Sequence, residues 1–177
     1  MQPGTRPPSS CPSRFPLARA STIAVRILPG CRGRITPAEL RKIALAVMKS
    51  EGVAPVTGVE IAVADADTVR ELNRLYRGQD EPTDVLSFGA NDGEAFIAAP
   101  DEAPSLGEVV ICLPIAEAQA RAANRPVAPE VAHLLVHGLL HVLGYDHEED
   151  EASVTMKGRE DEILESLGYG GQYAHGH

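Results

Sequence analysis

Residues 131–147 read VAHLLVHGLLHVLGYDH, an apolar stretch that carries four histidines and contains a glycine near its end. The apolar run that begins at Pro129 is typical of a buried helix, and proline favours the first turn of a helix. Gly144 readily adopts the left-handed conformation that ends a helix and turns the chain back. We therefore predict a central helix from Pro129 to Gly144, and the fold is expected to form around it.

Three of these histidines have the spacing of a metal site. His137 and His141 lie four residues apart, so a helix directs both imidazoles from one face, and the turn at Gly144 lets His147 approach the same point. Three neutral nitrogens with an open fourth position describe a catalytic zinc site rather than a closed structural one. The alternative, ordinary core or surface histidines, is disfavoured because three of the six histidines share this pattern. His133, one turn earlier, is expected to support the site or line its wall rather than bind the metal.

The spacing is also that of the HExxHxxGxxH metalloproteases, but Gly138 stands where those proteases carry glutamate. That glutamate is the general base that activates the metal-bound water, and glycine has no proton acceptor. A metal alone still lowers the pKa of its bound water toward ~7. The sequence therefore disfavours a protease and leaves hydrolysis of another substrate class open.

The segments around the histidine helix predict an α+β fold. Strands are expected at residues 23–28, 59–64, 84–89 and 107–113. Further helices are expected to begin at Pro37 and within residues 65–68, and to span about 114–123 and 152–167. The mixed order of strands and helices favours a single α+β domain over a doubly wound sheet. We expect a small mixed sheet of about four strands packed with about five helices, with the metal site at the end of the central helix.

The ends of the chain differ in composition from its body. Residues 1–21 are rich in Pro, Ser and Arg and have no apolar periodicity, which predicts a disordered extension. Their composition also matches an organelle transit peptide, although the prolines and the lack of a clear amphipathic helix disfavour it. The folded domain is expected to span residues 22–169, followed by a flexible tail at 170–177. No apolar run is long enough for a membrane span, and the N-terminus lacks the apolar region of a secretory signal, so we expect a soluble, cytoplasmic protein.

The cysteines favour a reducing compartment. Cys11, Cys31 and Cys112 form no CxxC pair, and three scattered cysteines do not describe a disulfide framework. Cys112 lies in the apolar run VVICL and is interpreted as a core residue rather than a nucleophile.

The charge distribution limits how the protein could bind nucleic acid. The net charge is -9, and no residue before Glu39 is acidic, while that segment holds six arginines. From Glu39 onward, ten basic residues face 25 acidic ones, a net of about -15. RNA binding therefore requires a local basic patch, and DNA or membrane partners are not expected.

Arg70, Arg74 and Arg77 form a compact basic set in the acidic body. Arg70 and Arg74 are interpreted as a solvated helix face. Arg77 lies at the end of its helix, before a turn-rich connection into a strand, where arginine could bind a phosphate bidentately. The acidic run Glu148–Glu151 is interpreted as complementing the N-terminus of the last helix. Asp146 and Glu108 are each considered as acceptors that could orient a ligand histidine.

The motifs VAHLLVHGLLHVLGYDH, ELNRLYRGQDEPTDVLSF (71–88) and SLGEVVICLP (105–114) resemble the YbeY endoribonucleases over about residues 23–168. The first motif is similar to the family signature HGxLHLxGYDH, with Val142 in place of leucine. The sequence departs from the family pattern at Glu108, where aspartate is usual, and at Gly89, where proline is common. The resemblance implies an α+β fold, one zinc ion on His137, His141 and His147, and a role for Arg77 in RNA cleavage.

The resemblance further implies a metal-dependent, single-strand-preferring endoribonuclease. Such an enzyme acts in maturation of ribosomal RNA, especially the small-subunit 3′ end, and in ribosome quality control. RNA is then the expected partner, together with the ribosome or its proteins. Two other hypotheses remain open, namely a zinc metalloprotease-like hydrolase and a non-catalytic ribosome-associated factor with a structural metal.

Overall fold

Four strands and five α-helices make up most of residues 23–90, 104–146 and 148–171, the part of the chain that the structure, a computed structural model, describes. The strands are β1 (Ile23–Ile27), β2 (Gly58–Ala64), β3 (Val85–Gly89) and β4 (Ser105–Cys112). The α-helices are α1 (Pro37–Ser50), α2 (Ala66–Arg77), α3 (Leu113–Ala122), α4 (Val127–Val142) and α5 (Asp150–Ser166), and a short 3-10 helix, η1 (Pro29–Cys31), follows β1.

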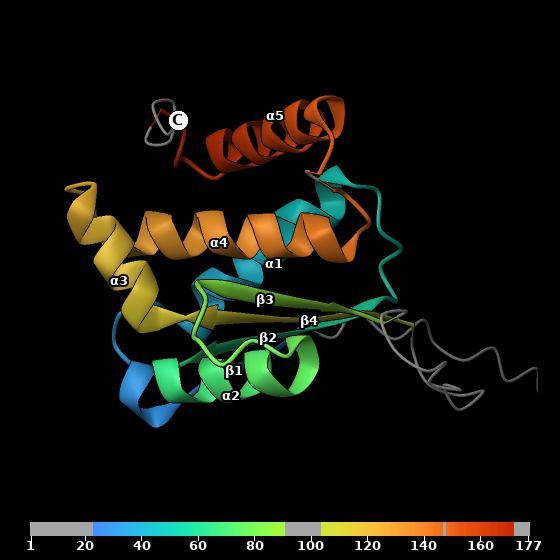
Figure 1. Ribbon diagram of the computed structural model, residues 1–177. Helices are drawn as coiled ribbons and strands as arrows, with labels where there is room; N and C mark the ends of the chain where they lie inside the picture. The colour runs from blue at the N-terminus through green and yellow to red at the C-terminus, as the bar shows by residue number, and fades with distance from the viewer. Residues whose placement is uncertain (1–22, 91–103, 147, 172–177) are drawn as a thin grey trace, which may run out of the picture.

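The strands form one mixed sheet in the order β1-β2-β4-β3. β1 and β4 run parallel to β2, whereas β3 is antiparallel to β4. In Figure 1, α4 and α1 lie over one face of the sheet, α2 lies over the other, and α5 packs on α4 away from the sheet. The prediction of a single α+β domain with a mixed four-stranded sheet and five helices is confirmed.

Local capping signals account for where two of the helices begin and end. Thr36 and Glu39 form a capping box at the start of α1, with Pro37 in the first turn. The Asp65 side chain accepts a hydrogen bond from the Thr68 amide at 2.8 Å and begins α2. Gly78 ends α2 in the left-handed conformation, with φ of 70°. Both helices begin where the sequence predicts, at Pro37 and within residues 65–68.

Helix α4 is the central element, because it contacts the sheet on one side and α5 on the other. It starts at Val127, two residues before the predicted start at Pro129. The first four amides of a helix have no acceptor within the helix, so a proline in the third position loses no hydrogen bond. Pro129 therefore indicates the first turn of α4 rather than the first residue of the helix. Gly144 has φ of 98° after the helix, as predicted.

Two apolar clusters lie on opposite faces of the sheet. The larger one packs the sheet against α1, α4 and α5 and includes Ile61, Ile111, Leu135 and Leu139. The smaller one lies on the α2 face and includes fully buried Cys112, so the interpretation of this cysteine as a core residue is confirmed. Within the described ranges, no helix has the length and apolar character needed to cross a bilayer. The predicted extension, residues 1–21, and nearly all of the predicted tail lie outside the described residues.

Candidate metal centre

The imidazoles of His137 and His141 face each other on the last two turns of α4. Their Nε2 atoms are 3.0 Å apart, and their ring centroids are 4.6 Å apart. The spacing of four residues therefore brings the two side chains together as the sequence predicts. His147, the third predicted ligand, lies outside the described residues. Among the residues that are described, no group of three or more possible metal ligands is present.

The outer ring nitrogen of each histidine contacts an oxygen that only accepts hydrogen bonds. His137 Nδ1 lies 2.6 Å from Glu160 Oε1, and His141 Nδ1 lies 3.0 Å from the carbonyl oxygen of Tyr145. Each Nδ1 therefore carries the proton and donates it. In the neutral rings both Nε2 atoms then present lone pairs, and the two atoms lie 3.0 Å apart.

This arrangement fits a bound cation. Two lone pairs 3.0 Å apart repel each other, and a cation that both nitrogens ligate removes the repulsion. Histidines that bind metals usually donate the other ring N–H to a carboxylate or a backbone carbonyl, which fixes the tautomer. His137 has the first kind of acceptor and His141 has the second. The donor set of imidazole nitrogens suits zinc.

Glu160 on α5 is the acceptor that supports the histidine side of the site. It is 8% exposed, and its Oε2 lies 3.7 Å from His133 Nε2. Burial raises the pKa of Glu160, but the hydrogen bonds and charges of His133 and His137 outweigh it and lower the pKa to about 2. The carboxylate is therefore ionised at neutral pH. His133 contacts this carboxylate, and its ring centroid lies 6.3 Å from that of His137, in line with the supporting role expected for it.

A cavity of about 440 Å³ opens beside the histidine pair. Its lining includes His137 and His141 from α4, Arg77 from the end of α2, Ser87 from β3, and Asp146. The Arg77 guanidinium donates to the Ser87 carbonyl oxygen at 3.1 Å. The end of α2 and the end of α4, about 60 residues apart in the sequence, therefore contribute to one cavity.

Arg70 and Arg74 do not line this cavity. Arg70 pairs with Asp80 at 2.8 Å and Arg74 pairs with Glu71 at 2.6 Å, and all four side chains are about half exposed. The interpretation of these two arginines as a solvated helix face is confirmed. Of the three arginines in the predicted basic set, Arg77 is the one placed at the cavity.

Gly138 lies where α4 packs directly on the sheet. A Cβ atom at this position would meet Val109 Cγ1 at 2.7 Å, Ser87 Oγ at 3.0 Å and Val85 Cγ2 at 3.2 Å. Any larger side chain at position 138 therefore forces Val109, and with it neighbouring side chains of the sheet, to shift. This packing gives a physical reason for glycine instead of glutamate at position 138, since side chains of the sheet occupy the space that the protease's general base requires.

Glu108 and Asp146, the two acidic residues considered as acceptors for a ligand histidine, lie in different places. Glu108 does not orient a histidine: its neighbour Val109 faces α4, so Glu108 faces the α2 side of the sheet. Burial and the adjacent Glu60 raise the pKa of Glu108, while Arg26 opposes them. Asp146 lines the cavity and accepts a hydrogen bond from the Glu148 amide at 3.1 Å. The acidic run supplies Asp150 and Glu151 to the first turn of α5, as interpreted from the sequence.

Glu160 and the Tyr145 carbonyl are parts of the site that the sequence analysis did not identify. No local pattern marks Glu160, because it lies 23 residues after His137 on a separate helix. The signal that would have found it is its position on α5, one turn from buried Met156 and three residues before buried Ile163. A carboxylate on the apolar face of a helix requires a partner in the core.

The family model described as Endoribonuclease YbeY matches residues 33–168. The chain belongs to the YbeY endoribonuclease family. An Endoribonuclease YbeY from Dehalococcoides mccartyi is 40% identical over 159 residues, which cover 85% of this chain and 92% of the relative. The corresponding protein from Rhodospirillum rubrum is 37% identical over 169 residues, covering 94% of this chain and 84% of the relative.

The fold of this YbeY family member is also found in a solved structure. The solution structure of TM1509 from Thermotoga maritima matches with a TM-score of 0.53 at 24% sequence identity. The match covers 85% of this chain and 95% of TM1509. At this level of identity the likeness concerns the fold alone. The family resemblance and the α+β fold expected from the sequence are both confirmed.

Proposed function

We propose that this chain is a zinc-dependent endoribonuclease that cleaves single-stranded RNA in the maturation of ribosomal RNA and in ribosome quality control. The observation that carries the proposal is the pair of facing Nε2 atoms of His137 and His141 at the wall of the cavity that Arg77 also lines. Membership of the YbeY family supplies the reaction class. The 3′ end of small-subunit RNA is the proposed target, and the cytoplasm is the proposed compartment.

His137, His141 and His147 would hold the zinc ion. Zinc bound there supplies Lewis-acid polarisation of a phosphodiester oxygen and lowers the pKa of coordinated water toward ~7. Glu160 and the Tyr145 carbonyl keep both Nδ1 atoms protonated, so that both Nε2 atoms stay available as ligands. The protein's contribution is thus a fixed pair of nitrogen donors at one end of a buried helix.

Arg77 would bind the scissile phosphate and offset the charge that develops on its oxygens. The hydrogen bond to the Ser87 carbonyl holds the guanidinium at the cavity and leaves its positive charge uncompensated by that neutral acceptor. Arg77 supplies positive charge at this point of an acidic body, in a cavity lining that also carries Asp84, Asp146 and Glu148. Arg77 is therefore the proposed catalytic side chain outside the ligand set.

The proposal is tested by measuring metal content and RNA cleavage on the same preparations. Wild type, His141→Ala and the control His175→Ala are purified in parallel, analysed by mass spectrometry for metals, and incubated with single-stranded ribosomal RNA fragments. We expect about one zinc per chain and cleavage in wild type and the control, and neither in His141→Ala. Equal cleavage by all three proteins would identify a contaminating nuclease. Reduced but measurable cleavage by a folded His141→Ala variant that has lost its metal would show that the metal is not required for the reaction.

A further inference from the structure

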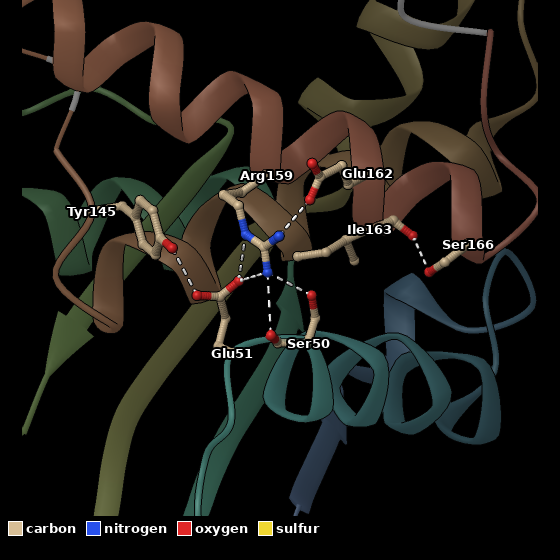
Figure 2. A network of polar contacts seen from close by, with 7 residues as sticks. All are labelled: Ser50, Glu51, Tyr145, Arg159, Glu162, Ile163 and Ser166. Atoms are coloured by element: carbon tan, nitrogen blue, oxygen red, sulfur yellow. Dashed lines mark hydrogen bonds and ion pairs between the residues drawn. The ribbon is translucent and has the colours of Figure 1, made fainter.

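A single carboxylate, that of Glu51, joins three separate parts of the fold (Figure 2). Glu51 follows α1, and its side chain is 11% exposed. Its Oε2 accepts a hydrogen bond from the Tyr145 hydroxyl at 2.7 Å. Its Oε1 accepts from Arg159 Nε at 2.9 Å and from Arg159 Nη2 at 2.6 Å. Glu51 thus connects the end of α1 to the turn after α4 and to α5.

Arg159 fixes the position of α5 on the end of α1. Besides Glu51, its guanidinium donates to the Ser50 carbonyl oxygen at 3.2 Å and to Ser50 Oγ at 2.8 Å, and it also pairs with Glu162. A cation at the C-terminus of a helix satisfies free carbonyls and interacts favourably with the helix dipole. The next residue along α5 is Glu160, which accepts the hydrogen bond of His137.

Tyr145 connects Glu51 to the other histidine. Its hydroxyl is held by Glu51, and its backbone carbonyl accepts the hydrogen bond of His141 Nδ1. The Tyr145 amide donates to the Leu140 carbonyl oxygen at 3.0 Å, so the residue is fixed both at its backbone and at the tip of its ring. Two residues later the chain reaches His147, the third proposed ligand.

We propose that Glu51 is a positioning residue of the metal centre, because it holds in place both acceptors that orient His137 and His141. One acceptor is the carboxylate of Glu160, next to Arg159, and the other is the carbonyl of Tyr145. The inference rests on the proposed metal site. It adds a residue that does not line the cavity and that, within the described part of the chain, hydrogen-bonds to Tyr145 and Arg159 rather than to His137 or His141. Its removal loosens both acceptors at once, whereas a purely structural ion pair would leave them unchanged.

The test compares zinc affinity with stability in the metal-free protein. Glu51→Gln keeps the side-chain size and removes the charge that binds Arg159. Loss of a group that directly accepts the hydrogen bond of a ligand histidine typically weakens metal binding by about 10–100-fold. Glu51 acts on these acceptors and not on the histidines themselves, so we expect zinc binding to weaken by about 3–10-fold. Zinc affinity is measured by competition with a chromophoric chelator, and the free energy of unfolding by urea titration.

Two further variants keep the test decisive. Glu117→Gln removes the carboxylate of the Arg34–Glu117 pair, 2.8 Å long and formed by residues far apart in the sequence, and should leave zinc affinity unchanged. Tyr145→Phe removes one hydroxyl and should weaken zinc binding less than Glu51→Gln does. Wild-type affinity in both Glu51→Gln and Tyr145→Phe, with lowered stability, would reduce Glu51 to a structural ion pair and overturn the inference.

A readout without metal separates this inference from the proposed function. Two-bond ¹⁵N–¹H spectra of the imidazoles at pH 8 report which ring nitrogen carries the proton. Wild type should show the Nδ1–H tautomer at His137 and His141, and Glu51→Gln should show mixed tautomers. If wild type binds no zinc, the proposed function fails, and this spectrum still decides the positioning role. Identical tautomers in wild type and Glu51→Gln would overturn it.

Discussion

Arg77 differs from the other arginines of α2 in the kind of group that it contacts. Arg70 and Arg74 each pair with a carboxylate, whereas Arg77 donates to the carbonyl oxygen of Ser87. Among the described residues, Arg77 forms no ion pair within 4.0 Å. A carboxylate partner would compete with a phosphate for the guanidinium, and a carbonyl competes less because it carries no net charge. The local environment therefore leaves this charge available to a substrate.

Substituting Arg77→Ala should lower the rate of RNA cleavage by about 10²–10³-fold, the usual effect of removing one donor that stabilises transition-state charge. Zinc content should not change, because Arg77 is not a proposed ligand. Single-turnover cleavage of a single-stranded RNA measures the effect. Arg74→Ala is the matched control on the same helix and should retain the wild-type rate, since Arg74 lies outside the cavity lining. Full cleavage by Arg77→Ala would remove the assigned role.

At the scale of single residues, the parts of the site that depend on local spacing could be predicted from the sequence. The parts that depend on tertiary contacts could not. His137 and His141 could be paired from the sequence because both lie on one helix, whose geometry is fixed. Glu160 could not be assigned, because its contact with His137 depends on how α5 packs on α4. The suggested role of Glu108 was wrong for the same reason, since the face of a strand that meets a helix is decided by the assembled sheet.

Gly138 and Gly158 are a matched pair of helical glycines with opposite surroundings. A Cβ at Gly138 would overlap Val109, whereas a Cβ at exposed Gly158 meets nothing within 4 Å. Overpacking costs about 1–3 kcal/mol, and alanine regains about 1 kcal/mol of helix propensity. We expect Gly138→Ala to lower the free energy of unfolding by about 1–2 kcal/mol and Gly158→Ala to raise it by about 0.5–1 kcal/mol. Urea titrations measure both, and a stabilised Gly138→Ala would show that the sheet yields without cost.

The cap of α2 should make part of the stability dependent on pH. Hydrogen bonds from the Thr68 backbone and side chain lower the pKa of Asp65 below its usual value of 3.8. Because the pKa of Asp65 is lower in the folded protein than in the unfolded chain, the stabilisation is present above pH 3.8. It is lost as the pH falls through the pKa of Asp65 in the folded protein. Asp65→Ala should therefore cost about 1 kcal/mol at pH 7, and progressively less below about pH 4.

Urea unfolding at pH 7, 5, 4 and 3 tests this prediction. Asp65→Asn serves as the control, because asparagine keeps a capping oxygen but does not titrate. The difference between Asp65→Asn and Asp65→Ala should stay constant over this range. A constant difference between wild type and Asp65→Ala would contradict the role assigned to the ionised cap.

At the scale of helices and strands, the sequence predicts which segments form a helix or a strand, and it places the ends of these elements to within about two residues. Helix α1 and helix α2 begin at their predicted caps because capping is a local interaction. Helix α4 begins two residues before Pro129, and α5 begins at Asp150 instead of about residue 152. A proline is accepted at any position in the first turn of a helix, and so are acidic residues. Pro129 in α4 and the acidic run in α5 therefore do not identify the first residue of either helix.

For the whole molecule, the order β1-β2-β4-β3 and the side of the sheet on which each helix packs are not encoded in any local pattern. The sequence predicts a mixed sheet from the order of elements alone. The insertion of β4 between β2 and β3 and the stacking of α5 on α4 depend on contacts between distant segments. These same contacts bring Glu160 to His137 and Glu51 to Tyr145.

Zinc should stabilise the whole molecule, because two of its proposed ligands lie on α4 and the third, His147, lies between α4 and α5 in the sequence. At a free zinc concentration of 100 times the Kd, the free energy of unfolding should rise by about 2.7 kcal/mol. For a domain of this size the Tm should rise by about 5–10 °C. Thermal scans with zinc and with a chelator measure the shift, and His141→Ala should show none. Equal Tm values for wild type under both conditions would contradict a zinc site in the folded chain.

The close approach at Gly138 also limits how this protein can change during evolution. Installing the protease's glutamate beside the first histidine requires one codon to change, but the sheet already fills the space of even its first side-chain carbon. A selection for peptide-bond hydrolysis would thus have to reshape Val85, Ser87 and Val109 before position 138 could vary. The fold disfavours the protease's chemistry through the side chains that pack against position 138, however similar the two histidine motifs look in an alignment.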